Sequence, residues 1–475
     1  MIFEKLPYDT SRPIAIDDKG DKLTTASLQE VTASLKSITG ENKAVVFCPA
    51  ENSVDFLAGY IAFMRLGMVP VMLDLYKRHR MLDALLECYR PAYIWLPASY
   101  APVTGEGECI FSFLSYRLYA MPGSRTLKNA DIAGNLALLL TTSGSTGSPK
   151  LVRLSYENVL ANAESIAEYL DINAEERPVT SLPMFYSYGL SVVHSHLLRG
   201  ATLLLTDEPV VQRKFWNFVK EMRATSMAGV PYTYEILKRL RIFDMDLPDL
   251  KVFTQAGGKL NAEVVREYID YAEHNGKRFI VMYGQTEATA RMSYLPFERA
   301  AEKYRSIGRP IPGGRFRLVD EEGRDIEESG VDGELVYEGP NVSLGYAETS
   351  EDLSKGDENS GVLYTGDIAR RDDEGFYYIT GRKKRFVKIF GNRVNLDAVE
   401  QMVKEVTLSA ACIGVDDKIT VFITDADKRQ EVADMLRERT GWQHVFDVLV
   451  IEEIPKNTSG KIQYTALYDC SKENE

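Results

Sequence analysis

The sequence predicts an α/β fold, in which a large N-terminal domain of helix-covered, mostly parallel sheets with a β-rich subdomain precedes a small α+β domain. Three observations predict it. Short apolar runs alternate with amphipathic segments over about the first 300 residues, which is typical of parallel sheets covered by helices. After about residue 306 the runs become alternating strands joined by Asp, Gly and Glu turns. Beyond residue 381 amphipathic helices return.

The large domain contains apolar runs of strand length and amphipathic segments of helix length. An apolar stretch over 56–75 is interrupted by Arg65, Gly67 and Pro70. It therefore predicts a buried helix that ends near Gly67, followed by a buried strand, rather than a membrane span. We expect strands over 44–48, 69–75, 136–140, 201–205, 251–255 and 279–283, and helices over 157–170 and 262–274.

The pattern of apolar and polar residues changes twice in the last third of the chain. Alternating strands are expected over 314–326, 333–339 and 375–381, as in an antiparallel sheet or barrel. A basic run then follows Gly381, and helices over 396–406 and 429–441 flank a strand pair over 413–424. The sequence thus predicts a large domain over 1–381 and a small one over 382–475, which is within the usual domain range.

Composition excludes several classes of protein. A chain of 475 residues exceeds the usual size of a domain with one hydrophobic core, so two or more domains are expected. Its net charge of −13 argues against general nucleic-acid binding. The five cysteines are scattered without metal-ligand spacing, so a disulfide framework is not expected. The N-terminal sequence MIFEKLPYDT has no apolar signal core. We expect a soluble, cytoplasmic protein with no nucleic-acid partner and no membrane span.

The stretch TTSGSTGSPK, from Thr141 to Lys150, follows an apolar run. Its backbone N–H groups and short hydroxyls suit a phosphate cradle. It is not a Walker-type loop, because Ser148 and Pro149 separate Gly147 from the lysine. It also lacks the Gly-x-Ser-x-Gly spacing of a hydrolase elbow. Taken alone, the stretch is either a phosphate loop or a flexible surface loop.

Six stretches in order resemble the motifs of the adenylate-forming enzymes: acyl-CoA synthetases, adenylation domains of peptide synthetases, and luciferases. The resemblance covers nearly the whole chain. The stretches are TSGSTGSPK from Thr142, YGQTEA from Tyr283, GELVYEGPNVSLGY from Gly333, YTGD from Tyr364, GRKKRFVKIFGNRV from Gly381 and PKNTSGKI from Pro455.

The resemblance implies an AMP-forming acid–thiol ligase with ATP and Mg²⁺ as cofactors. A carboxylate attacks the α-phosphate of ATP, giving an acyl-adenylate and pyrophosphate. A thiol of coenzyme A or of a carrier-protein phosphopantetheine then displaces AMP. In-line displacement at phosphorus needs positioning and charge stabilisation rather than an activated protein nucleophile. The expected partners are a small carboxylic acid and, in one alternative, an acyl or peptidyl carrier protein.

The resemblance also assigns nucleotide-binding residues. The loop hydroxyls, its amides and Lys150 would hold the β- and γ-phosphates, and Thr286 would reach the α-phosphate. Glu287 would help hold Mg²⁺, a hard ion that prefers oxygen ligands. Tyr283 would face adenine, and Asp367 would accept the ribose hydroxyls. The full set is Thr142, Ser143, Gly144, Ser145, Thr146, Gly147, Lys150, Gly257, Gly258, Lys259, Tyr283, Gly284, Gln285, Thr286, Asp367, Arg382 and Lys461.

Each of these residues has an ordinary alternative when it is read alone. Lys150 is then a solvated lysine and Tyr283 a core side chain at the end of a strand. Glu287 is a carboxylate at the start of a helix. Asp367 is a turn residue after glycine, and Lys461 is an exposed lysine near the end of the chain.

The resemblance implies three catalytic residues, which are Lys461, Thr286 and Glu287. Lys461 lies in the stretch TSGK, where the family's lysine bridges the carboxylate and the α-phosphate. A compact charge on a flexible stem suits oxygens whose charge shifts during transfer. Lys384 falls at the family's hinge, at about 382–384, about which a mobile small domain rotates between half-reactions. Lys388 and Gly391 would then face the thiol, where a glycine lets pantetheine pass close to the backbone.

The acyl pocket is expected around Tyr186, Tyr188, Gly189 and Tyr232. In the stretch FYSYG, from Phe185 to Gly189, Tyr186 replaces a histidine that the family often has, and places a larger, neutral phenol at the pocket mouth. A leucine also stands where a glycine usually follows the phosphate-loop lysine, and the small domain is shorter than is typical. A pair at His194 and His196 could imitate a metal site, but no third ligand is evident.

Two other readings remain open. The acyl-adenylate could pass to an amine, which would make an amide ligase, or the chain could be a non-catalytic nucleotide-binding relative. Intact Glu287, Asp367 and Lys461 argue against the second reading. The motifs do not specify the acceptor or the acid.

Overall fold

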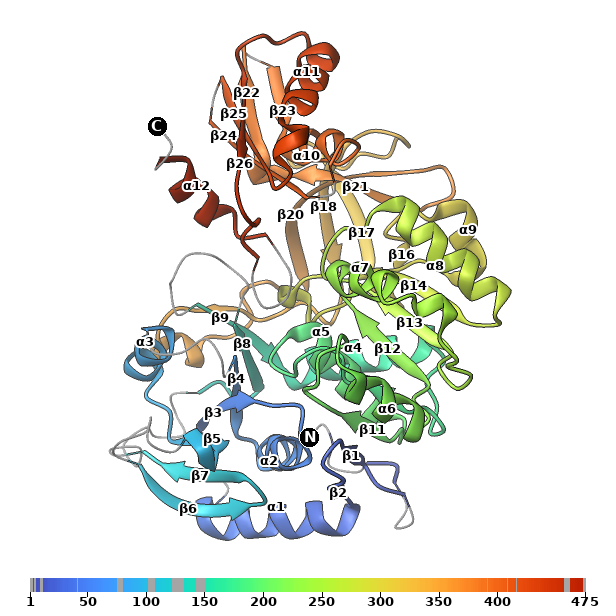
Figure 1. Ribbon diagram of the computed structural model, residues 1–475. Helices are drawn as coiled ribbons and strands as arrows, with labels where there is room; N and C mark the ends of the chain where they lie inside the picture. The colour runs from blue at the N-terminus through green and yellow to red at the C-terminus, as the bar shows by residue number, and fades with distance from the viewer. Residues whose placement is uncertain are drawn as a thin grey trace.

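The computed structural model contains two large sheets, an antiparallel sheet and a C-terminal α+β region (Figure 1). It describes residue 3 and residues 6–8, 12–40, 42–74, 80–100, 107–121, 132–141, 150–390, 392–407, 409–415, 417–456 and 462–472.

The first large sheet has six parallel strands at its centre and antiparallel strands at both edges. The strand order is β16 (Arg309–Pro310), β15 (Ser293–Tyr294), β14 (Arg278–Tyr283), β13 (Val252–Gln255), β12 (Ser226–Gly229), β10 (Pro178–Val179), β11 (Leu203–Leu205), β1 (Ala15–Asp17) and β2 (Lys22–Leu23).

The second large sheet has the same plan, with a parallel centre formed by β8, β4, β3 and β5. Its order is β19 (Gly345–Ala347), β9 (Leu151–Ser155), β8 (Leu136–Thr141), β4 (Val69–Asp74), β3 (Val45–Ala50), β5 (Tyr93–Pro97), β7 (Tyr116–Ala120) and β6 (Glu108–Phe113). Its helices are α1 (Thr25–Thr39), α2 (Val54–Arg65) and α3 (Arg80–Tyr89).

Alternation of side chains along the strands explains how helices cover both faces of the first sheet. Phe253 and Phe279 pack in one core with α6 (Arg213–Glu221), α7 (Pro231–Arg239) and α8 (Ala262–His274). Their neighbours Val252 and Ile280 point the other way, towards α4 (Tyr156–Tyr169) and α5 (Ser187–Leu198). Because α4 and α5 also contribute to the core of the second sheet, these two helices lie between the sheets.

The strands and helices expected before residue 306 are all present, with bounds that are identical or differ by at most two residues. The prediction of a helix followed by a strand over 56–75 is confirmed by α2 and β4. Among the described residues, no helix combines the length and the apolar character that a bilayer crossing requires.

The alternating stretches after residue 306 form the antiparallel sheet that the sequence predicts. Its order is β17 (Arg315–Val319), β18 (Gly333–Glu338), β20 (Val362–Arg371) and β21 (Tyr377–Arg382). A short helix, α9 (Ala300–Lys303), precedes it. The last strand, β21, ends at Arg382, next to a 3₁₀ turn over Lys383–Arg385.

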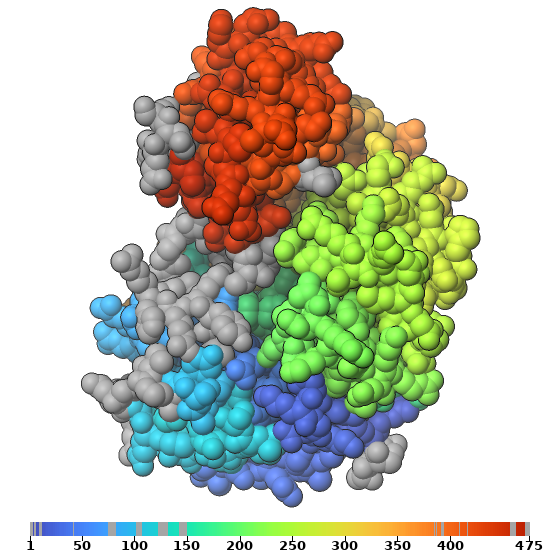
Figure 2. All heavy atoms as spheres, viewed as in Figure 1, coloured from blue at the N-terminus to red at the C-terminus, as the bar shows by residue number. Residues whose placement is uncertain are grey.

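The C-terminal region has an apolar core of its own, built around Val387, Leu396, Val421 and Leu436. In Figure 2 this region, in orange and red, stands over one end of the molecule. The expected helices and strand pair are present, and β26 adds a third strand parallel to β25. Its elements are β22 (Phe386–Ile389), β23 (Asn392–Asn395), α10 (Leu396–Val403), β24 (Ala410–Val415), β25 (Lys418–Ile423), α11 (Arg429–Thr440), β26 (Phe446–Val450) and α12 (Tyr464–Lys472).

Candidate active site

The Asp367 carboxylate, on β20, joins the antiparallel sheet to the end of β14. Its Oδ2 accepts hydrogen bonds from the Tyr283 hydroxyl, at 2.5 Å, and from Gln285 Nε2, at 3.1 Å. Its Oδ1 lies 3.2 Å from Arg382 Nε. Asp367 is only 4% exposed. Since a carboxylate offers about four acceptor positions, these three contacts leave capacity for one further donor.

Tyr283 is held in place as the last residue of β14. Burial, with the neighbouring Asp367 carboxylate, raises the pKa of the Tyr283 hydroxyl. The hydroxyl therefore stays protonated at neutral pH and acts as the donor. Gln285 Nε2 also donates to the Thr365 carbonyl at 2.9 Å, which fixes the amide beside the carboxylate.

Glu287 lies two residues after Gln285 and contacts strand β19. The Tyr346 hydroxyl donates to Glu287 Oε1 at 2.7 Å. Lys150 Nζ lies 3.7 Å from the centroid of the Tyr346 ring and 3.4 Å from a carboxylate oxygen of Glu348. These contacts follow from strand pairing, because β19 is antiparallel to β9, the strand that begins directly after Lys150.

Thr286 begins a 3₁₀ turn over Thr286–Ala288. Its Oγ1 lies 3.0 Å from Ser187 Oγ, at the N-terminal end of α5. The residue expected at the α-phosphate is thereby joined to the helix that carries Tyr188 and that has Tyr186 as its N-cap.

The buried Asn341 side chain holds the loop after Thr286 in shape. Its Nδ2 donates to the carbonyls of Ala288, at 2.8 Å, and Arg291, at 2.9 Å. The Thr289 hydroxyl donates back to the Asn341 carbonyl at 2.6 Å. Thr289 and Ala290 have φ values of 58° and 116°. This conformation is costly for residues that have a Cβ, and residues that adopt it cluster at functional sites.

Gly257 shapes the turn that follows β13. Its φ is +83°, and a Cβ there would stand 2.5 Å from the Tyr186 hydroxyl oxygen, so only glycine fits. Burial raises the pKa of Tyr186 to about 12, which keeps its phenol neutral. Gly258 and Lys259 are exposed beyond this turn. Gly257 and Tyr186, expected in different subsites, are thus in contact.

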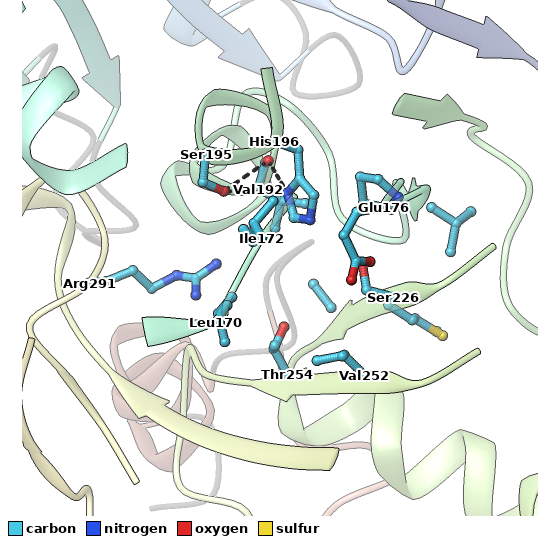
Figure 3. A pocket seen from close by; sticks show the side chains of 14 residues that line it. Leu170, Ile172, Glu176, Val192, Ser195, His196, Ser226, Val252, Thr254 and Arg291 are labelled. Carbon is cyan, nitrogen blue, oxygen red and sulfur yellow. Dashed lines mark hydrogen bonds between the residues drawn. The ribbon is translucent and has the colours of Figure 1, made fainter. Parts of the chain in front are cut away.

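A narrow cavity of about 20 Å³ lies along α5, beyond the contact between Thr286 and Ser187. Figure 3 shows its polar side chains directed towards a common space. Tyr188 is buried beside this cavity, and its hydroxyl donates to the carbonyl of Thr254, at 2.7 Å. The polar lining residues are Glu176, Ser195, His196, Ser226, Thr254 and Arg291.

Two residues expected in the acyl pocket, Tyr232 and Gly189, have contacts of other kinds. Tyr232 is 47% exposed, and its ring faces Lys456 Nζ at 5.0 Å. Gly189 is a close-packing position, since a Cβ there would stand 2.4 Å from the Pro183 carbonyl oxygen. The contact between Lys456 and Tyr232 brings the C-terminal region over the N-terminus of α7.

Several expected site residues lie outside the described residues, and the structure gives them no position. For Lys384 the backbone is described within a 3₁₀ turn, but the side chain is not. Lys388 is exposed on β22. The residues without a described position are Thr142, Ser143, Gly144, Ser145, Thr146, Gly147, Gly391 and Lys461.

The two histidines of α5, His194 and His196, are buried in the core. His194 Nε2 lies 2.7 Å from the Tyr60 hydroxyl. His196 Nδ1 lies 2.8 Å from the Val192 carbonyl. Burial lowers the pKa of His194 to about 3 and that of His196 to about 4. Within the described parts of the chain, no group of three His, Cys, Asp or Glu side chains is placed to hold a metal.

A family model described as "AMP-binding enzyme" matches residues 15–347. The chain belongs to the AMP-binding enzyme family. This match runs from the first strand of the first sheet to Tyr346 and its neighbour Ala347 on β19.

Curated relatives of this AMP-binding enzyme include two acid–CoA ligases. The medium-chain fatty-acid–CoA ligase of Escherichia coli K12 is 27% identical over 344 residues, which are 69% of this chain and 60% of the relative. The feruloyl-CoA synthase of an Amycolatopsis species is 30% identical over 346 residues, 69% of this chain and 68% of the relative. The match thus spans about two thirds or less of the relatives' own length.

A solved structure has the same fold as this AMP-binding enzyme. The o-succinylbenzoate coenzyme A synthetase MenE from Bacillus subtilis, in complex with ATP and magnesium ion, has a TM-score of 0.77. The two chains are 21% identical, and the superposition covers 97% of each. The likeness extends through the C-terminal region, beyond the segment that the family model matches.

Several residues that contact the candidate site have no role assigned from the sequence. Tyr346 lay inside a recognised stretch, GELVYEGPNVSLGY, without an assigned role. Ser187 and Asn341 lie in or beside recognised stretches, and only the fold brings them to Thr286 and its loop. Arg291 follows YGQTEA by three residues, and its full burial was the missing signal.

Proposed function

We propose that this chain activates a carboxylic acid with ATP, forming an acyl-adenylate and pyrophosphate, and transfers the acyl group to a thiol. The observation that carries the proposal is the convergence of Asp367 and Glu287 on one loop. Gln285 and Tyr283 hold the first carboxylate, and Tyr346 holds the second, which belongs to the residue after Thr286. Family membership supports the same reading.

The nucleoside would bind at Asp367. Its remaining acceptor position suits a ribose hydroxyl, and the exposed Arg382 side chain holds its other oxygen. The turn at Gly257 would admit the adenine ring close to the backbone, near the Tyr283 ring. These residues bind and orient the nucleotide, and they do not take part in bond making.

Glu287 fits the magnesium ion that accompanies ATP. Its Oε1 accepts from Tyr346, and within the described residues its Oε2 has no hydrogen bond or ion pair. Mg²⁺ is commonly held by one or two carboxylates together with substrate phosphates, so one glutamate suffices on the protein side. When bound, the ion would reduce the negative charge on the phosphates. Tyr346 would keep the carboxylate oriented for it.

The protein supplies charge and position to the adenylation step. Thr286 would donate to an α-phosphate oxygen, and Lys461 would neutralise the attacking carboxylate and the phosphate. Lys150 would contact the outer phosphates. Its neighbours Tyr346 and Glu348 hold its ammonium group beside the end of the loop 142–149. Such preorganised charges stabilise the transition state without an activated nucleophile.

The thiol step would use a second position of the C-terminal domain. We propose domains over 1–381 and 382–475, with a hinge at Lys384, because the C-terminal region has its own core and follows a short 3₁₀ turn. Rotation would bring Lys388 and Gly391 to the site. Coenzyme A is the proposed acceptor, and carrier-protein pantetheine is the alternative thiol.

An acid panel tests the function. Acid-dependent pyrophosphate release would be measured with and without coenzyme A, and products would be identified by mass. We expect acyl-adenylate in its absence and thioester in its presence. Asp367→Asn should weaken AMP binding about 10-fold or more, since hydrogen bonds to charged groups contribute about 1.5–3 kcal/mol.

The control for that variant is Asp332→Asn, a substitution of the exposed aspartate that pairs with Arg370. It should leave AMP affinity unchanged. Nucleotide binding without pyrophosphate release from any acid would favour the non-catalytic reading. Amide formation with an added amine, but no thioester, would favour the amide ligase.

A further inference from the structure

Among the residues that the structure describes, two arginines are almost completely buried, and they differ in one respect. Arg153 is 0% exposed and Arg291 is 1% exposed. Arg153 donates from Nε, Nη1 and Nη2 to four backbone carbonyls, and Nη2 also pairs with Glu358. This guanidinium is satisfied on all three nitrogens, as buried charges in folded proteins normally are.

The guanidinium group of Arg291 is only partly hydrogen-bonded. Its Nη1 contacts the Tyr169 hydroxyl at 3.1 Å and Met282 Sδ at 2.6 Å. Its guanidinium carbon lies 4.4 Å from the centroid of the Tyr188 ring. Its Nε and Nη2 are buried without any hydrogen-bond partner, and no carboxylate pairs with it among the described residues.

An uncompensated buried charge is costly, so a chain that keeps one usually gains function from it. The loop that carries Arg291 is itself strained at Thr289 and Ala290 and is held by Asn341. Asn162 also donates to the Arg291 carbonyl at 3.0 Å. The backbone is thus fixed on both sides of the position that sends this side chain inwards.

Arg291 points into the cavity along α5 (Figure 3). Facing it are Ser226, whose buried hydroxyl also lacks a partner among the described residues, and His196. Glu176, which lines the cavity as well, accepts a hydrogen bond from the Thr225 hydroxyl and forms no ion pair with Arg291. The cavity therefore presents three unused polar donors, two of them on a cation.

We propose that Arg291 binds a second carboxylate, at the far end of the acid that this enzyme activates. The inference rests on the proposed function and names its substrate class: acids with a carboxylate at each end. The planar guanidinium matches a carboxylate with two parallel N–H groups, and Nε and Nη2 form such a pair. Ser226 Oγ would donate to the same group.

The position of the cavity sets the distance between the two carboxylates. Thr286 contacts Ser187 at the first residue of α5, whereas Val192 and His196 of the same helix line the cavity. At a rise of about 1.5 Å per residue, the cavity begins roughly 7 Å along the helix from the reacting end and reaches about 13 Å. A short to medium diacid spans that distance.

The test compares diacids with matched monoacids. Pyrophosphate release would be measured with straight-chain dicarboxylates of four to eight carbons and monocarboxylates of the same lengths, and with isophthalate and benzoate as an aromatic pair. We expect kcat/KM for the best diacid to exceed that of its matched monoacid about 100-fold or more, since sites built for a polar group reject analogues without it. Arg291→Met should abolish this preference, and AMP affinity should not change.

Arg153→Met is the matched control for folding. Removing Arg153 leaves four backbone carbonyls and Glu358 without their partner, so the Arg153→Met variant should unfold at a clearly lower temperature than the wild type. Arg291→Met removes an unpaired charge and should unfold at the wild-type temperature or above it. The best-binding diacid should raise the wild-type unfolding temperature and leave that of Arg291→Met unchanged.

The outcomes separate this inference from the proposed function. A wild-type preference for monoacids, or a diacid preference that survives Arg291→Met, would overturn the inference while leaving adenylation intact. Equal destabilisation by the two arginine substitutions would overturn it too, because Arg291 would then be structural. If no acid releases pyrophosphate, the proposed function fails. Diacid-dependent stabilisation of the wild type alone would still support the Arg291 site, and its absence would refute it.

Discussion

Tyr346 joins the two charged groups at the phosphate side of the site: its hydroxyl donates to Glu287 Oε1 at 2.7 Å, and its ring centroid lies 3.7 Å from Lys150 Nζ. We expect Tyr346→Phe to raise the Mg²⁺ concentration for half-maximal adenylation about 10-fold, since a hydrogen bond to a charged group is lost. A magnesium titration at saturating ATP measures this. The control is Tyr89→Phe, which removes a buried hydroxyl that donates to the carbonyl of Ala347, the residue next to Tyr346 on β19. An equal shift in both variants would contradict the assigned role.

The contact between Gly257 and Tyr186 predicts a steric effect beyond backbone strain. Gly276→Ala, at a positive φ with open space around it, should cost about 1 kcal/mol of stability from conformation alone. Gly257→Ala should cost more, because its Cβ would meet the Tyr186 hydroxyl. Adding Tyr186→Phe should recover part of the difference. Equal losses in urea unfolding for both alanine variants would show that the contact is unimportant.

Burial of His194 predicts acid sensitivity. Its pKa is about 3 in the folded protein and about 6.5 when unfolded, so between these values the unfolded state binds more protons. Stability therefore falls as the pH drops, by about 2 kcal/mol between pH 7 and 5 for this group. His194→Gln should flatten the profile by that amount, measured by urea unfolding at both pH values. The exposed His274→Gln is the control, and a slope unchanged by His194→Gln would exclude the effect.

The proposed hinge predicts that the two half-reactions separate. Lys384→Pro fixes φ and should hold one domain orientation, whereas Lys384→Ala removes the side chain and leaves the backbone free. If the adenylating orientation is held, single-turnover pyrophosphate release survives and thioester synthesis collapses. Both steps would be measured side by side with a verified acid and thiol. Loss of both steps together, or of neither, would argue against rotation about Lys384.

The strands and helices were predictable from the sequence because each carries its own signal. Apolar runs such as 136–140 and 279–283 are buried strands, and 262–274 is an amphipathic helix with Asn261 as its N-cap. The parallel pairing of β26 with β25 was missed, since half of its side chains face solvent and its apolar run is short. The antiparallel edge strands of the first sheet, β2, β15 and β16, were missed for a similar reason: they have two residues each and take their pairing from the fold.

The site was predictable only where a motif is continuous in sequence. YGQTEA indicated Thr286 and Glu287, and the fold places both residues in one 3₁₀ turn. The partnership of Asp367 with Tyr283 and Gln285 depends on sheet packing across about 80 residues, which spacing cannot reveal. Tyr232 was placed in the pocket by its position in the chain, but it projects to the surface. The unpaired charge of Arg291 is a property of burial and has no sequence signature.

The central claim, that this chain forms an acyl-adenylate from ATP by means of the Lys461 charge, is tested most directly by single-turnover adenylation in Lys461→Ala, with Lys456→Ala as control. Lys461 lies outside the described residues, five positions after the lysine that faces Tyr232. The account predicts that Lys461→Ala lowers the rate of adenylate formation by about 10²–10³, keeps AMP affinity and still consumes preformed acyl-adenylate. Adenylate formation by Lys461→Ala at the rate of Lys456→Ala and the wild type would contradict it.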